Sequence, residues 1–161
     1  MAEFNGRSLL TIDSKGRLFL PQGYREQLGE NFVISLSSDM ETLAFYCQED
    51  WEKKSRQLRR LPDTDRRAHQ LVRNVFSNTF APYNTDSQGR VLIPQAIRQE
   101  HHLTEGVEIL LLGVGMTLEI WNYEFYQKGA GSASLEQKQA ILDYVNAKYF
   151  TEDGKGDQDN G

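Results

Sequence analysis

The stretch that decides the fold is Asp13-Ser14-Lys15-Gly16-Arg17-Leu18-Phe19-Leu20-Pro21-Gln22, and the chain contains it twice. The second copy is Asp86-Ser87-Gln88-Gly89-Arg90-Val91-Leu92-Ile93-Pro94-Gln95, which begins 73 residues later (86 − 13). Asp, Ser, Gly, Arg, three apolar residues, Pro and Gln recur in the same order. Because so much agreement is improbable by chance, the sequence predicts an internal duplication.

The similarity between the copies continues downstream of the quoted stretch. Leu28-Gly29-Glu30 matches Leu103-Thr104-Glu105, and Thr42-Leu43 matches Thr117-Leu118. Each copy therefore spans about fifty residues with a strand-turn-strand pattern. A unit of that size buries little apolar surface by itself, so the two halves are expected to share one core. The sequence predicts a β-rich α+β protein built from two homologous halves.

The remaining segments predict how the chain is divided. Residues 5–51 form the first unit, 52–77 a helical hairpin, 78–128 the second unit, and 134–150 a C-terminal helix, followed by a disordered acidic tail over 151–161. The second helix of the hairpin has a clear apolar stripe made of Ala68, Leu71, Val72, Val75 and Phe76. Asp63 or Thr64 is expected to cap it, directly after Pro62.

Two further expectations concern the end of the chain. Ser134 and Gln137 have the spacing of a capping box, which predicts a helix from Leu135 to about Phe150. Its apolar side is expected to contain Ile141, Leu142, Val145 and Tyr149. Gly-rich residues 129–133 before it are interpreted as a flexible link.

Bulk composition favours a cytosolic protein. The chain has 161 residues, a net charge of −5 and one cysteine. A lone cysteine forms no disulfide framework, no apolar run is long enough to span a membrane, and the first residues lack the features of a signal peptide. Local charge differs from the total, because eight basic residues crowd between positions 53 and 73, namely Lys53, Lys54, Arg56, Arg59, Arg60, Arg66, Arg67 and Arg73.

Arg17 is the strongest candidate for a binding residue. It follows a turn in which Gly16 accepts a positive φ and Asp13 accepts hydrogen bonds from backbone N–H groups. Arginine binds phosphate, or guanine O6 and N7, in a bidentate manner. The alternative is an intramolecular ion pair in which Asp13 and Arg17 stabilise the turn, and both interpretations can hold together. The same alternatives apply to Asp86 and Arg90.

Other basic residues near the turns are weaker candidates. Lys15 lies at the tip of the first turn, where it either contacts phosphate or is simply solvated. Arg25, like Arg98 in the second copy, follows the Pro and either flanks a DNA groove or bridges subunits. Arg7 precedes the first strand and is expected to add a contact. The basic run over 53–73 is a solvated outer face, a DNA contact or a surface for another subunit's acidic tail.

No pattern indicates an enzyme. His101 and His102 are adjacent, so their side chains diverge, and Cys47 lies in an apolar strand where it is expected to be core. His69 lies on the basic helix without a partner at metal-ligand spacing. We therefore expect no metal, no cofactor and no small-molecule substrate.

The duplicated motif resembles the MraZ family of bacterial transcriptional regulators. The resemblance rests on Asp13–Arg17 with Leu20-Pro21, and on Asp86–Arg90 with Ile93-Pro94, and covers about residues 4–127. It implies two SpoVT/AbrB-like swapped-hairpin β-barrel halves, and a ring-shaped homo-oligomer associated with the nucleoid. It also implies double-stranded DNA binding at short promoter repeats, mostly to repress the division and cell wall operon that encodes it. Asn5 and Gln88 depart from the family pattern by replacing basic residues.

Two other functions stay open at this point. One is an antitoxin-like protein of the same barrel class whose main partner is a toxin. The duplication and the short acidic tail disfavour it, because such proteins usually have one barrel unit and a disordered tail. The other is a barrel used only for assembly, in which Arg17→Ala alters oligomer size and nothing else.

Overall fold

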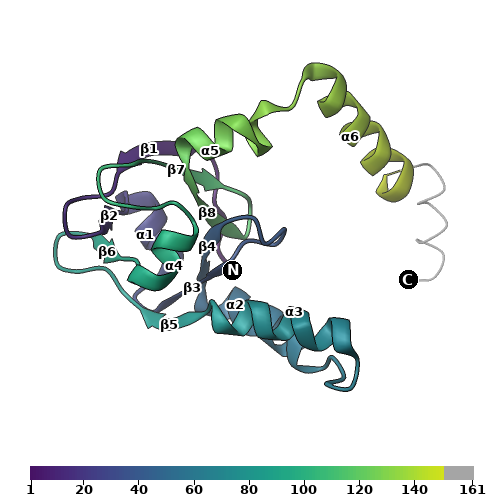
Figure 1. The fold of residues 1–161 in the computed structure, drawn as a ribbon, viewed down its shortest axis with the longest axis horizontal. Coiled ribbons are helices and arrows are strands. Elements are labelled where there is room, and N and C mark those ends of the chain that lie inside the picture. The colour runs from purple at the N-terminus through teal and green to yellow at the C-terminus, as the bar shows by residue number, and fades with distance from the viewer. Residues whose placement is uncertain (151–161) are drawn as a thin grey trace. The chain divides into compact units, whose positions relative to one another are not determined.

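The computed structural model describes residues 1–150, and both copies of the duplicated unit contain the same elements in the same order. The first copy has β1 (Arg7–Thr11), β2 (Arg17–Phe19), α1 (Gln22–Leu28), β3 (Phe32–Leu36) and β4 (Leu43–Cys47). The second has β5 (Phe80–Tyr83), β6 (Arg90–Leu92), α4 (Gln95–Glu100), β7 (Glu108–Gly113) and β8 (Thr117–Asn122). The duplication predicted from the sequence is therefore present in the fold (Figure 1).

Between the copies lie two antiparallel helices, and three short or medium helical segments follow β8. The hairpin consists of α2 (Gln48–Arg59) and α3 (Arg66–Ser77). The C-terminal elements are α5 (Tyr123–Lys128), a 3-10 turn (Ala130–Ser132) and α6 (Leu135–Tyr149). No helix within residues 1–150 has the length and apolar character needed to cross a membrane.

The main sheet exchanges strands between the two copies. Its order is β1-β7-β8-β4-β3-β5, and every neighbouring pair is antiparallel. The first strand of each copy thus pairs with the hairpin of the other copy, while β4 and β8 join the two hairpins at the centre. This pairing is the swapped-hairpin arrangement that the family resemblance implies, formed within a single chain.

Strand β5 opens the second copy, although its sequence does not indicate a strand. Pro82 lies within β5 and has no N–H to donate, which makes the segment a poor strand by sequence. Its position at the edge of the sheet tolerates a proline, since only one side of the strand must pair. The register between β3 and β5 shifts here, with Phe32 opposite Tyr83 and Ile34 opposite Phe80.

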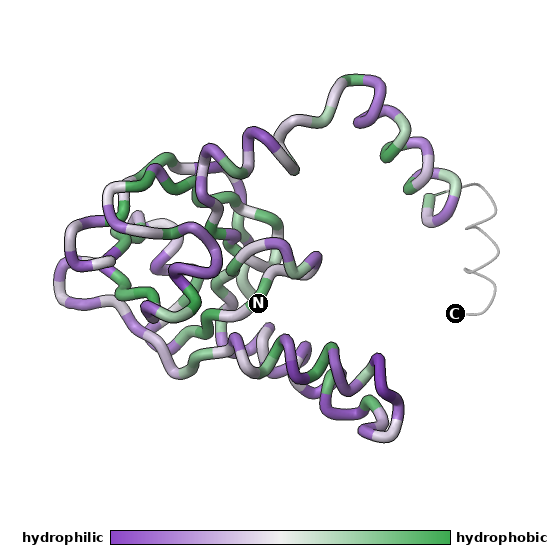
Figure 2. Tube along the Cα trace, in the orientation of Figure 1, coloured by the Kyte–Doolittle hydropathy of each residue, from purple (hydrophilic) through white to green (hydrophobic). Residues whose placement is uncertain are grey.

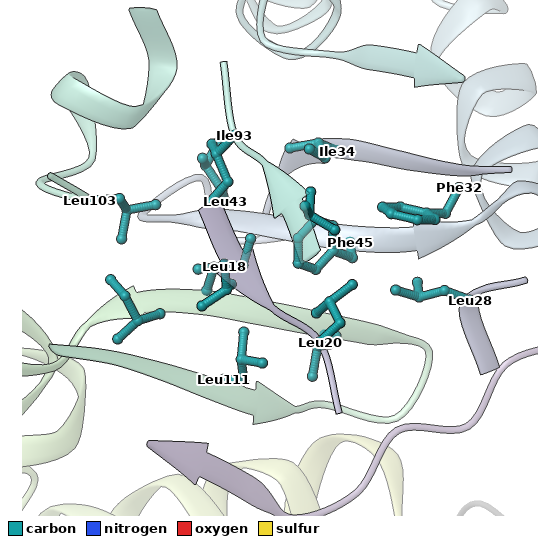
Figure 3. Packing of buried hydrophobic residues seen from close by; sticks show 14 of the residues in the cluster. Leu18, Leu20, Leu28, Phe32, Ile34, Leu43, Phe45, Ile93, Leu103 and Leu111 are labelled. Atoms are coloured by element: carbon teal, nitrogen blue, oxygen red, sulfur yellow. The ribbon is translucent and has the colours of Figure 1, made fainter. Parts of the chain in front are cut away.

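A two-stranded ribbon of β2 and β6 packs across the main sheet and joins the two motifs directly. Leu18 lies opposite Val91, and both are completely buried. Figure 3 shows Leu18, Leu20 and Ile93 meeting Ile34 and Phe45 of the main sheet. Because both copies contribute to this one cluster, each half depends on the other for its buried surface.

The hairpin α2–α3 covers the opposite face of β3 and β4. A smaller apolar cluster contains Val33, Ala44, Tyr46, Trp51 and Val75. Trp51 packs edge-on against both Tyr46 and Phe76, with ring centroids 5.2 Å and 6.2 Å away. Figure 2 shows that the far end of the hairpin is mostly hydrophilic, so only its base is attached through apolar contacts. Leu61 lies beyond the end of α2 and is exposed.

The second helix of the hairpin begins later than predicted. Its N-cap is Asp65 rather than Asp63 or Thr64. Asp65 Oδ1 accepts hydrogen bonds from the backbone N–H groups of Arg67 (3.0 Å) and Ala68 (3.1 Å). The preceding residues form a turn in which the Asp65 N–H donates to the Pro62 carbonyl.

We expect Asp65→Ala to destabilise α3 by about 1 kcal/mol, because two N–H groups of the first helical turn lose their acceptor. Asp63→Ala is the matched control, since Asp63 is exposed and does not cap the helix. Amide hydrogen exchange of α3, followed in both variants, checks this. Equal acceleration in the two variants would contradict the assignment of the cap.

The C-terminal segment forms its own compact unit from Phe125 onward. The capping box of Ser134 and Gln137 is present as predicted, with the Gln137 N–H 3.1 Å from Ser134 Oγ. The link over 129–133 is partly ordered, since Ala130–Ser132 form a 3-10 turn. The expected apolar side of α6 is not buried, and Ile141, Leu142 and Tyr149 are all more than half exposed. The predicted acidic tail lies outside the described residues.

Candidate functional site

The two Asp-x-x-x-Arg turns have the same hydrogen bonds. In the first, Asp13 Oδ1 accepts from the N–H groups of Lys15 (2.9 Å) and Arg17 (2.8 Å), and Asp13 Oδ2 accepts from Arg17 Nε (2.7 Å). The Gly16 N–H closes the turn on the Asp13 carbonyl at 3.0 Å. The aspartate therefore fixes both the backbone of the turn and the guanidinium of its arginine.

The second turn repeats this arrangement with different residues. Asp86 Oδ1 accepts from the N–H groups of Gln88 and Arg90, and Asp86 Oδ2 accepts from Arg90 Nε, all at 2.9 Å. The Gly89 N–H donates to the Asp86 carbonyl at 3.0 Å. The duplicated sequence thus produces two turns with nearly identical hydrogen bonds.

These ion pairs confirm one of the two interpretations of the motif without excluding the other. Arg17 uses Nε for Asp13, and within residues 1–150 its two Nη groups have no partner. About a quarter of the Arg17 side chain is exposed. The aspartate consequently holds the guanidinium so that its outer edge, which carries the bidentate donors, is available for a ligand.

The ribbon places both motif arginines on one face. Arg17 lies opposite Leu92, and Phe19 lies opposite Arg90. Because Leu18 and Val91 between them point into the core, these four flanking residues point outward by strand alternation. Arg17 and Arg90 are diagonal neighbours, whose Cα atoms in such a ribbon are about 7–8 Å apart. We call this set, Arg17, Phe19, Arg90 and Leu92, the ribbon face.

The sequence had not identified two members of the ribbon face. Phe19 and Leu92 are about half exposed although both are large and apolar. Their outward position follows from strand alternation around Leu18 and Val91. The sequence does not reveal this alternation, because the inward and outward residues of these runs are all apolar. A ribbon face with two arginines and two apolar side chains offers both charge and apolar contact.

The other candidate residues divide into two groups. Lys15, at the tip of the first turn, and Arg7, at the start of β1, are exposed and remain available to a ligand. Arg98 instead points into the protein, whereas Arg25 is only partly buried. Arg98 is only 7% exposed and donates to the Gly16 carbonyl, and Arg25 lies against Gly89. The structure thus places Arg98 beneath the first turn, and it places Arg25 against the second turn at a partly exposed position.

The basic run of the hairpin lies on exposed helix surface. Lys53 pairs with Glu49 at 3.7 Å, whereas the arginines over 56–73 have no carboxylate within ion-pair distance among residues 1–150. Arg59 packs over the Phe76 ring, with 5.9 Å between Cζ and the ring centroid. The structure is compatible with all three interpretations of this run, namely a solvated outer face, a DNA contact and a surface for another subunit's acidic tail.

The electrostatics of the turns follow from their hydrogen bonds. The N–H of Arg17, assisted by its side chain and by the Lys15 N–H, lowers the pKa of Asp13 to about 2 from its ordinary 3.8. The N–H of Arg90 likewise lowers the pKa of Asp86. Both carboxylates therefore stay ionised at neutral pH and keep the guanidinium groups oriented.

We expect the first turn to be acid-sensitive in a defined window. Because the pKa of Asp13 is lower in the folded protein, its contribution to stability is complete above about pH 4 and is lost as the pH falls through about 2. An NMR titration of the Asp13 carboxyl carbon should give a midpoint near 2. A midpoint near 3.8 would mean that the N–H groups do not bind the carboxylate. Asp13→Asn should lose this acid dependence.

The residues considered for catalysis or metal binding have structural roles in the fold. Cys47 is buried, as predicted, and its thiol donates to Asp50 Oδ2 at 3.1 Å. Tyr46 and Trp121 are buried in the core. No cluster of three metal-ligating side chains occurs within the described part of the chain.

The fold and the paired turns define the class of this protein as a duplicated, swapped-hairpin protein of the SpoVT/AbrB type. Comparison with known families agrees. The family described as "MraZ protein, putative antitoxin-like" matches residues 4–74 and again residues 75–143. The chain belongs to the MraZ family.

Curated relatives match the chain over most of its length. "Transcriptional regulator MraZ" of Carboxydothermus hydrogenoformans is 34% identical over 88% of this chain and 99% of its own. The proteins of the same name from Acetivibrio thermocellus and Pelotomaculum thermopropionicum are 33% and 36% identical, over 86% and 87% of this chain and 98% and 96% of their own. Family membership confirms the prediction that the chain is not an enzyme.

Proposed function

We propose that this protein is a transcriptional regulator that binds double-stranded DNA through the ribbon face. One observation carries the proposal. Arg17 and Arg90 are each oriented by an aspartate, have no partner for their Nη groups among residues 1–150, and are diagonal neighbours on a two-stranded ribbon. The major groove of B-DNA admits such a ribbon, and arginine is the commonest reader of guanine there. The names of the curated relatives support the same function.

Lys15 and Arg7 extend the ribbon face as phosphate contacts in this proposal. Both are exposed and lie in the first copy, while the second turn carries Gln88 in place of the lysine. The first turn should therefore contribute more of the phosphate attraction than the second. Phosphate contacts position a protein on the duplex, and base contacts select the sequence.

The finer proposal is that several copies of the ribbon face act together. A homo-oligomer presents the turns repeatedly and matches short repeats in a promoter, where linked sites gain affinity through effective concentration. We propose that the chain represses its own operon in this way, in the cytoplasm and on the nucleoid. Exposed apolar side chains on α6, including Ile141, Leu142 and Tyr149, support self-association, since such surface is usually covered in an assembly.

The test is a fluorescence anisotropy titration with labelled double-stranded DNA taken from upstream of the protein's own coding sequence. We expect binding to weaken about 30-fold between 50 and 200 mM salt if each ribbon face neutralises about three phosphates. Light scattering at both salt concentrations controls for changes in oligomer size. Absence of binding at 50 mM salt by a correctly assembled protein would overturn the proposal and favour a partner that is itself a protein.

A further inference from the structure

Each turn is supported from beneath by an arginine of the other copy. Arg98, on α4 of the second copy, donates from Nη1 to the carbonyl of Gly16 in the first turn at 3.1 Å. Arg25, on α1 of the first copy, lies against Gly89 in the second turn. The contacts are thus crossed, and each turn depends on a residue more than sixty positions away in the chain.

The glycines of the motif make room for these arginines. A Cβ at Gly16 would lie 1.3 Å from Arg98 Nη1, and one at Gly89 would lie 2.8 Å from Arg25 Cζ. Both glycines also have positive φ, +82° and +79°. The backbone conformation therefore favours glycine at both sites. At Gly16 the close approach of the buried Arg98 guanidinium adds a second requirement, whereas at Gly89 a Cβ would displace the end of the partly buried Arg25 side chain.

The environment of Arg98 is unusual for a residue that serves stability alone. Its side chain is buried, and no carboxylate within residues 1–150 lies at ion-pair distance. Guanidinium stays charged in proteins, and burial of an uncompensated charge is unfavourable for folding. A positive charge beneath the first turn is favourable, however, when that turn meets phosphate or the acceptor edge of guanine.

The support of the second turn differs in detail. Arg25 is only partly buried, and its Nε donates to the Leu20 carbonyl of its own copy at 2.9 Å. Its guanidinium lies over the Phe19 ring, 5.7 Å from the centroid, and against Gly89. Arg25 therefore supports the second turn by packing, whereas Arg98 supports the first turn by a hydrogen bond.

We propose that Arg98 is a positioning residue of the first turn, and that Arg25 has the reciprocal role for the second turn. Neither contacts DNA directly. Arg98 holds the backbone that carries Lys15 and Arg17, and its buried guanidinium adds positive charge beneath the first turn. The proposal rests on the proposed function, and it couples DNA binding by each motif to the helix of the opposite copy.

A double-mutant cycle tests this coupling. Upstream promoter DNA is titrated with wild type, Arg98→Gln, Arg17→Ala, Arg90→Ala and the two double variants that combine Arg98→Gln with each. We expect Arg98→Gln to weaken binding about tenfold in wild type and in the Arg90→Ala background. In the Arg17→Ala background the further loss should stay below about twofold, because the residue that Arg98 positions is already gone.

Hydrogen-exchange mass spectrometry supplies a readout that does not require DNA. Arg98→Gln should accelerate exchange in peptides that cover residues 13–20 about tenfold and leave those covering 86–93 unchanged. Arg25→Gln should do the converse. Arg98→Lys, which keeps the charge but not the planar donor, should show the faster exchange with a smaller loss of affinity than Arg98→Gln.

The outcomes separate the two proposals. If the wild-type protein does not bind the DNA, the proposed function is wrong. Hydrogen exchange alone then decides whether Arg98 positions the first turn. Equal losses from Arg98→Gln in the Arg17→Ala and Arg90→Ala backgrounds would overturn the coupling, since a general loss of folding affects both turns alike. Unchanged exchange over residues 13–20 in a folded Arg98→Gln protein would overturn it as well.

Discussion

Arg17→Ala should weaken binding to upstream promoter DNA by about 2 kcal/mol, or roughly 30-fold, without a change in oligomer size. Arg17 is the arginine of the first turn, and Asp13 holds its Nε at 2.7 Å so that both Nη groups face outward. Truncation of the side chain removes the bidentate hydrogen-bond donor and one positive charge. The anisotropy titration at two salt concentrations, run with light scattering, measures both quantities.

Two variants make this result specific to the turn. Lys138→Ala removes the same unit of charge from α6 and should leave the affinity within about twofold of wild type. Arg90→Ala should weaken binding less than Arg17→Ala, because Gln88 replaces the turn lysine beside it. A changed oligomer size in Arg17→Ala with unaltered DNA affinity would show that the motif is an assembly device.

Phe45→Ala should lower the free energy of unfolding by about 4 kcal/mol. Phe45 is completely buried in β4, packs edge-on against Phe32 at 5.5 Å, and pairs with Leu118 of the second copy. Because this position joins the two halves, the loss should appear as one cooperative transition that includes both. Urea unfolding followed by fluorescence and by circular dichroism checks whether the transitions coincide.

The matched control is Phe19→Ala, which removes the same side chain from the exposed ribbon face. Phe19 is about half exposed, so its truncation should destabilise the fold by about 1 kcal/mol or less. Separate transitions for the two copies in the Phe45→Ala protein would contradict a single shared core.

Local patterns in the sequence were sufficient to predict most elements of the fold. Pro21 and Gly29 mark the ends of the helix Gln22–Leu28, and the apolar run Phe32–Leu36 forms the strand that follows it. Failures occurred where tertiary contacts override local propensity. β5 forms despite Pro82 because β3 offers an edge to pair with, and α5 forms directly after β8 in residues where no helix was predicted.

The candidate site shows the same division between local and non-local information. The bonds of Asp13 to Lys15 and Arg17 lie within five residues, so the repeated motif predicts them. The hydrogen bond from Arg98 to the Gly16 carbonyl joins residues 82 positions apart, and it depends on the pairing of β2 with β6. A single sequence does not reveal a contact between residues so far apart. The sequence therefore predicts only a groove or a subunit contact for Arg25 and Arg98.

The most direct test of the central claim is methylation protection of guanine N7 in upstream promoter DNA bound by wild type and by Arg17→Ala. Guanine N7 lies in the major groove, where the ribbon face is proposed to bind. The account predicts that wild type protects guanines at regularly repeated positions, and that Arg17→Ala loses protection at a subset of them. Unchanged guanine N7 reactivity in a saturated wild-type complex, with adenine N3 protected in the minor groove, would contradict it.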